Sequence, residues 1–189
     1  MTQLYAISFL APIFSAWIAS IMLDDEDLSR SKVLALITGL LGTIVIIRPG
    51  FTEVSPFLIL GLLAPLLWGF TTVSTKRLSN EYSHLTLLFI LALCTMSLSL
   101  PFALLSWTPL SPEFWTFALG IATVGLIVHI SFIKAYKYAP LIDIVPMEFS
   151  MLIFASLYAS IFFAEGFDAW VYLGASLIVA SNLYIILRS

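Results

Sequence analysis

The stretch VPMEFS, residues 145–150, places a carboxylate, Glu148, inside the mainly apolar run from Leu141 to Phe163. If this run crosses a membrane, the charge costs on the order of 3 kcal/mol by insertion scales, so Glu148 is expected to face a helix-bundle interior or a water-filled cavity. There it could bind a substrate amine or exchange a proton for a cationic substrate. The alternative is structural, with Lys134 as its ion-pair partner. Asp143, near the start of the run, is expected to be solvated.

Four other residues could take part in such a site, and three of them have a structural alternative. Pro146 removes a backbone donor and would loosen the start of its helix, exposing backbone to a ligand. Trp68 could stack on a planar ligand or face lipid. His129 could relay protons or make a hydrogen bond between helices. Lys134 could line a cavity or extend to the membrane surface beside Lys137.

Motifs that would indicate an enzyme are absent from the sequence. There is no His-Glu-x-x-His zinc motif, no Gly-x-Ser-x-Gly nucleophile turn and no phosphate-binding loop. One glutamate and one lysine do not make an acid–base site without a positioned substrate. We therefore expect no catalytic activity, no metal and no cofactor.

The composition indicates a membrane protein. Of 189 residues, 61% are hydrophobic and only 10% are charged, and the mean hydropathy is +1.07. Soluble domains are about half apolar and a quarter charged, so this chain could not hide its apolar surface in water. The net charge of −3 and the scattered basic residues give no indication of nucleic-acid binding.

Seven apolar runs separated by short polar segments fit the ~20 residues that a helix needs to cross the hydrocarbon core. The predicted fold class is therefore an all-α polytopic membrane protein. The predicted spans are Leu4–Leu23, Val33–Ile47, Pro56–Thr75, His84–Leu105, Phe114–Tyr136, Leu141–Phe163 and Trp170–Leu187.

The basic residues predict the orientation of the spans. Seven of the 8 Lys and Arg residues fall on one side of the predicted membrane, and Arg48 alone falls on the other. The positive-inside rule makes the first side cytoplasmic. The C-terminus is then cytoplasmic and the N-terminus external. The cytoplasmic set is Arg30, Lys32, Lys76, Arg77, Lys134, Lys137 and Arg188.

The chain resembles itself at an offset of about 140 residues, and each matched unit is a helix, an acidic turn and a helix. Ser15 with Ala19, and Ala155 with Ala159, predict a small-residue face on each first helix, where helices could approach closely. By the charge count the two units cross the membrane in opposite directions, as inverted repeats of secondary transporters do. A chance match between membrane hairpins is the alternative. The matches are Ala19–Leu23 with Ala159–Phe163, Asp25 with Glu165, and Ile46–Arg48 with Ile186–Arg188.

Three segments resemble the EamA-like permeases of the drug/metabolite transporter superfamily. Residues 7–50 are similar to the closing helix pair of the family's first repeat, and residues 61–79 to the helix that opens the second. Residues 144–188 are similar to the last two helices, and VPMEFS resembles the Ala-Pro-Phe-Glu-Tyr-Ser/Thr motif of one bacterial branch. Ser181 and Asn182 stand where the family often has glycine.

This resemblance implies a ten-helix inverted-repeat fold of which about three helices are missing here. Residues 1–50 would be the last two helices of the first repeat, and residues 56–188 the five-helix second repeat. The implied function is secondary transport of a small polar or amphipathic metabolite by alternating access, coupled to protons or to exchange. The alternative is a non-transporting truncated fragment, or one part of a split transporter.

The resemblance also implies partners and a location. The expected partners are a small-molecule substrate, the lipid bilayer, and a second chain or a homodimer that supplies the missing helices. The expected location is the bacterial inner membrane, as a multi-pass protein. The site residues implied together are Glu148, Pro146, Trp68, Lys134 and His129.

Overall fold

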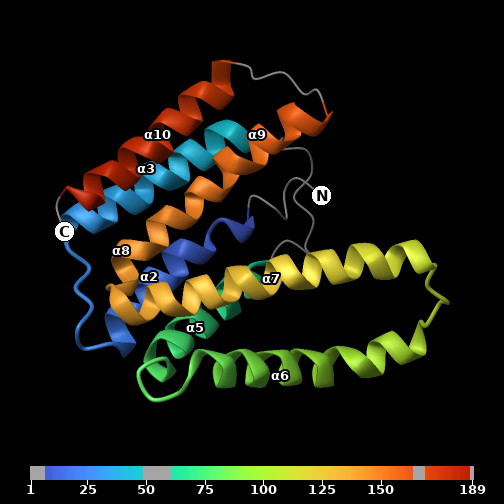
Figure 1. Cartoon of the computed structure of the whole chain (residues 1–189). Coiled ribbons are helices and arrows are strands. Elements are labelled where there is room, and N and C mark those ends of the chain that lie inside the picture. The colour runs from blue at the N-terminus through green and yellow to red at the C-terminus, as the bar shows by residue number, and fades with distance from the viewer. Residues whose placement is uncertain (1–6, 49–60, 164–168, 188–189) are drawn as a thin grey trace. The chain divides into compact units, whose positions relative to one another are not determined.

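The computed structural model describes residues 7–48, 61–163 and 169–187, and these residues form helices and no strands. The chain divides into two compact units, residues 1–74 with 139–189, and residues 75–138. The elements in chain order are α2 (Ala11–Met22), α3 (Arg30–Ile47), α5 (Leu63–Leu78), α6 (His84–Leu105), α7 (Pro112–Tyr138), α8 (Leu141–Ile144), the 3₁₀ segment η1 (Val145–Ser150), α9 (Met151–Phe163) and α10 (Ala169–Ile186) (Figure 1).

Five of the seven predicted spans are confirmed as helices long and apolar enough to cross a membrane. The other two predicted spans contain the shorter helices α2 and α5, and their first residues, from Leu4 and from Pro56, lie outside the described residues. So do Glu165 and Arg188. The five long spans are Arg30–Ile47, His84–Leu105, Pro112–Tyr138, Leu141–Phe163 and Ala169–Ile186.

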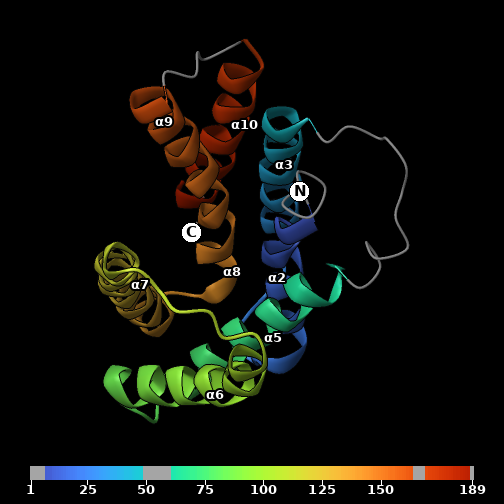
Figure 2. The same cartoon turned by 90° about the vertical axis from the view of Figure 1, so that its right-hand side faces the viewer.

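In the larger unit, α3 and α10 form an antiparallel pair and lie side by side in both views (Figures 1 and 2). Residues near the start of α3 contact residues near the end of α10, and residues at the end of α3 contact the start of α10. The Ser181 hydroxyl donates a hydrogen bond of 2.6 Å to the Ala35 carbonyl. At the far end, Arg48 lies over the Trp170 ring, 5.6 Å from its centroid.

Two glycines allow the backbones of this pair to touch. A Cβ on Gly174 would lie 2.5 Å from the carbonyl oxygen of Gly42, and a Cβ on Gly42 would lie 2.7 Å from that of Gly174. Neither position has room for a side chain, and small residues at such crossings are what membrane helices use to pack closely. The α3–α10 pair is therefore a tight unit of the fold.

The small-residue prediction for the first helices of the two repeats is half right. Ser15 and Ala19 of α2 are fully buried, and a Cβ on Gly69 of α5 would lie 2.9 Å from the Ser15 amide nitrogen. In contrast, α9 has no buried side chain, and Ala155 is exposed. Close packing is therefore not found at Ala155, and at the half-buried Ala159 it stays a prediction.

In the smaller unit, α6 and α7 form a hairpin. The Ser83 hydroxyl caps α6 by accepting a hydrogen bond of 3.2 Å from the Thr86 amide. The Lys76 ammonium donates to the Tyr136 carbonyl in the last turn of α7, where a cation is favoured by the helix dipole. Leu87 is the one buried side chain that the structure describes in α6. Such uniformly apolar, exposed surfaces suit helices surrounded by lipid.

Candidate functional site

The VPMEFS stretch interrupts the regular helix, as the proline predicts. Residues 145–150 form η1, with Pro146 in its first turn, between α8 and α9. Pro146 has no N–H to donate to the carbonyl four residues earlier, so regular α-helical bonding cannot pass through it. The expected loosening at the start of the penultimate span is confirmed as a 3₁₀ segment.

One column of the 3₁₀ helix is completely buried. Residues three apart are eclipsed in a 3₁₀ helix, so Pro146 and Phe149 form one column and both are fully buried, and Val145, in the column of Glu148, is fully buried as well. Met147, in the next column, is exposed. The Phe149 ring lies against α3, where a Cβ on Gly39 would be 2.5 Å from Cδ2 of the ring. A glycine at position 39 makes this contact possible.

Glu148 lies in the middle of η1 and is half-buried. Its Oε1 atom is shielded from solvent. Because η1 contacts α2, α3, α9 and α10, this carboxylate is carried by the most centrally placed segment of the larger unit. The location agrees with the expectation that Glu148 faces the bundle, and its role in binding stays a prediction.

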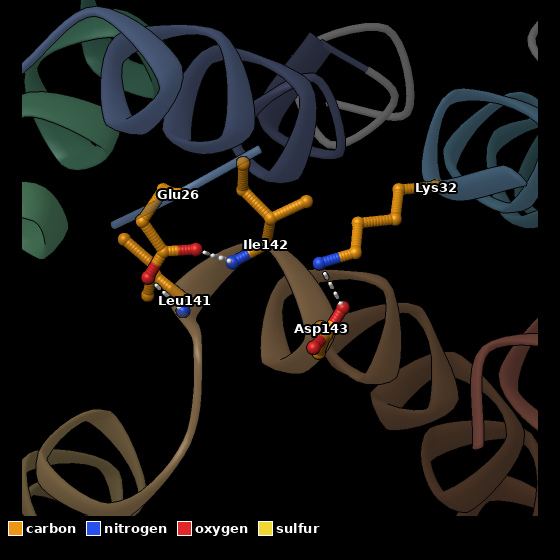
Figure 3. A network of polar contacts seen from close by, with 5 residues as sticks. All are labelled: Glu26, Lys32, Leu141, Ile142 and Asp143. Carbon is orange, nitrogen blue, oxygen red and sulfur yellow. Dashed lines mark hydrogen bonds and ion pairs between the residues drawn. The ribbon is translucent and has the colours of Figure 1, made fainter. Parts of the chain in front are cut away.

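Sequence reasoning missed a polar network just before this segment (Figure 3). The Glu26 carboxylate, from the turn after α2, accepts hydrogen bonds from the amides of Leu141 and Ile142, the latter at 3.0 Å. Lys32 of α3 pairs with Asp143 at 2.8 Å. The expectation that Asp143 is solvated is wrong, because its side chain is only 14% exposed and bears this ion pair. The sequence of an acidic turn does not indicate that one of its glutamates binds backbone amides far along the chain.

The other predicted site residues are divided between the two units. Trp68 of α5 belongs to the larger unit and is 52% exposed. Lys134 and His129, both on α7, belong to the smaller unit; Lys134 is exposed and His129 is half-buried. His129 Nδ1 lies 2.9 Å from the Gly125 carbonyl one turn earlier, so the described bond is within the helix and not between helices. Pairing of Lys134 with Glu148 stays a prediction.

A shallow, open hollow of about 540 Å³ lies along α7, and its walls are mainly apolar. None of the predicted site residues lines it. Its lining residues are Thr116, Phe117, Gly120, Ile121, Val124 and Gly125. Within the described ranges, no group of three or more His, Cys, Asp or Glu residues could hold a metal ion.

Long apolar helices, close glycine crossings and a carboxylate in a proline-broken helix together define a multi-pass α-helical membrane protein. A model of the EamA-like transporter family matches residues 55–187. The chain belongs to that family, which is one of transporters and not of enzymes.

Curated relatives agree with the family match. The chain is 26% identical over 188 residues to an S-adenosylmethionine uptake transporter of Rickettsia prowazekii, covering 98% of the chain and 63% of the relative. It is 24% identical to a riboflavin transporter of Brucella anthropi, covering 97% of the chain and 66% of that relative. The chain thus spans less than two thirds of the length of these relatives.

A solved crystal structure has the same fold. It superposes with a TM-score of 0.80 at 19% identity, over 100% of this chain and 69% of the other. At this identity the likeness concerns the fold alone.

Proposed function

We propose that this chain acts in the transport of a small polar or amphipathic metabolite across the bacterial inner membrane, and that Glu148 is its substrate-binding or proton-coupling group. The observation that carries the proposal is the position of Glu148. The carboxylate sits on η1, where Pro146 breaks the helix. η1 contacts the five helices α2, α3, α8, α9 and α10 in a chain of the EamA-like transporter family. Broken helices near the substrate are a recurring feature of secondary transporters.

The proposed substrate class is an amphipathic metabolite with a planar heteroaromatic ring. The relatives named above handle S-adenosylmethionine and riboflavin, and each of these compounds contains such a ring. A carboxylate favours the first of the two, because S-adenosylmethionine carries a sulfonium cation and an amine. Trp68 is the proposed stacking residue.

The proposed mechanism is alternating access between two inverted repeats, with the C-terminus in the cytoplasm. Two findings support it. α2 begins at Ala11 and α9 begins at Met151, which agrees with the 140-residue offset of the internal similarity. The last helices of the two proposed repeats, α3 and α10, run antiparallel. The last helices of two inverted repeats would be related in this way. The proposed repeat units are residues 1–50 and 56–188.

Uptake by bacteria that express the chain tests the proposal. Labelled S-adenosylmethionine and labelled riboflavin are offered in parallel, to cells with the chain alone and to cells that also express the part of a relative that the chain does not match. Glu148→Gln is expected to lower uptake at least tenfold at equal protein abundance. Glu81→Gln, the same chemical change at an exposed residue, is the control and should stay within twofold.

The two expression conditions separate the alternatives. Uptake only with the complementing part supports a transporter that needs a second chain. Equal uptake by the unmodified chain and by the Glu148→Gln variant at every pH contradicts the assigned role of the carboxylate. No uptake of either compound in either condition contradicts the proposed substrate class.

A further inference from the structure

The segment that carries Glu148 is held at its start by a buried carboxylate from another part of the chain. Glu26 is only 7% exposed and accepts hydrogen bonds from two successive amides, those of Leu141 and Ile142 (Figure 3). The first amides of a helix have no partner within the helix. The preceding residue, Pro140, offers no side-chain cap. Glu26 supplies both the acceptors and a negative charge that the helix dipole favours.

Two further contacts hold the same segment, and both come from α3. Lys32 pairs with Asp143 at 2.8 Å, with side chains 22% and 14% exposed. Phe149 packs against Gly39 with no space for a Cβ. The contacts at residues 141–143 and at residue 149 lie on both sides of Glu148 in the sequence, so residues 26–39 hold the segment before and after this carboxylate.

We propose that Glu26 and Lys32 are positioning residues for the Glu148 site, acting through the backbone of residues 141–150. This inference rests on the proposed function of Glu148. Its consequence is that the hairpin of α2 and α3, which lies outside the family match at residues 55–187, forms part of the site. A carboxylate with two amide hydrogen bonds and an adjacent ion pair fix both the position and the rotation of the segment.

The internal similarity does not extend to the polar network. At the 140-residue offset, Glu26 corresponds to Gly166, Lys32 to Tyr172, and Asp143 to Gln3. Position 8, which corresponds to Glu148, is a serine. The residues of the network are therefore not repeated at the matched positions, although Glu165 stands one residue before Gly166.

The test measures the position of the segment without requiring transport. In a background with the exposed Cys94 changed to Ser, one reporter cysteine replaces Met147, which is 38% exposed beside Glu148. A second reporter replaces Leu173, which is 49% exposed on α10. The rate of modification by N-ethylmaleimide is measured for each reporter in native membranes.

Glu26→Gln is expected to change the rate at position 147 at least ~3-fold and the rate at position 173 by less than ~1.5-fold, because charge-assisted hydrogen bonds are the stronger ones. Asp25→Asn, the same loss of charge at an exposed neighbour in the same turn, should change neither. Lys32→Asp and Asp143→Lys should each alter the rate at position 147, and the double exchange should restore it.

Equal rates at position 147 for Glu26→Gln and Asp25→Asn would overturn the inference. So would a parallel change at both reporters, because it would indicate general loosening. The outcome is separable from that of the proposed function. A selective change at position 147, combined with normal uptake by Glu148→Gln, would keep the positioning role and remove the transport role of the carboxylate.

Discussion

The glycine crossing of α3 and α10 offers a substitution whose effect can be worked out from the structure. In Gly174→Ala, the new Cβ would lie 2.5 Å from the Gly42 carbonyl oxygen and 2.5 Å from Cγ1 of Ile46. Close C···O contacts between helices are normally about 3.3–3.6 Å, so the backbones must separate by about 1 Å. The Gly42 atom is backbone and cannot move alone. Overpacking of this kind costs about 1–3 kcal/mol.

Gly120→Ala on α7 is the matched control. A Cβ at position 120 has no other heavy atom within 4 Å, so it adds no clash. Both substitutions gain the same helix propensity, about 1 kcal/mol in favour of Ala. The difference between them isolates the steric cost, about 1–3 kcal/mol, which corresponds to a factor of roughly 5 to 150 in the unfolding equilibrium.

Thermal unfolding in detergent, followed by circular dichroism, measures this difference. Gly174→Ala should unfold at a lower temperature than Gly120→Ala, and Gly120→Ala at the same temperature as the unmodified chain or a higher one. Equal midpoints for the two variants would refute the reasoning, because the close backbone approach would then be absent in the protein.

Three further substitutions test other contacts. Ser181→Ala removes the 2.6 Å hydrogen bond to α3 and should lower the free energy of unfolding by about 0.6–1.7 kcal/mol, measured in the same melts; no loss would mean that the bond contributes nothing. Arg48 has a left-handed backbone with φ of 44°, a conformation that favours glycine. Arg48→Gly should therefore be about 1 kcal/mol more stable than Arg48→Ala, since both variants lose the contact with Trp170. Equal stability of the two variants would contradict the left-handed conformation. Pro146→Ala restores a backbone donor and should let η1 become α-helical, which amide exchange at position 146 would detect as new protection.

The helices could be predicted from sequence more fully than the contacts between them. Two long spans, 84–105 and 141–163, have the predicted bounds, because the lengths of apolar runs and the polar breaks between them determine membrane helices directly. The second predicted span begins at Val33, and the structure begins α3 three residues earlier, at Arg30. Charged residues at that end continue the helix, which hydrophobicity alone does not indicate.

The break at Pro146 could be predicted because proline acts locally, through its own missing N–H. The Glu26 network could not. Its acceptor lies 115 residues in sequence from the first amide that it binds, and a backbone amide is present at almost every residue, so no residue type marks it. For the same reason the ion pair of Asp143 has no signal in the sequence, since its partner Lys32 belongs to another helix. Residue type thus predicts which charged side chains are unusual in a membrane span, whereas the packing of the helices determines which groups they bind.

The 3₁₀ segment also changes the geometry of the span that contains it. Six residues rise ~12 Å in a 3₁₀ helix and ~9 Å in an α-helix, and they turn through ~720° instead of ~600°. Switching η1 between the two forms would therefore shift α8 by ~3 Å along the axis and rotate it by ~120° relative to α9, without breaking the chain of helical turns. A few altered hydrogen bonds within the VPMEFS segment would thus be enough to reorient α8, the short helix at its end.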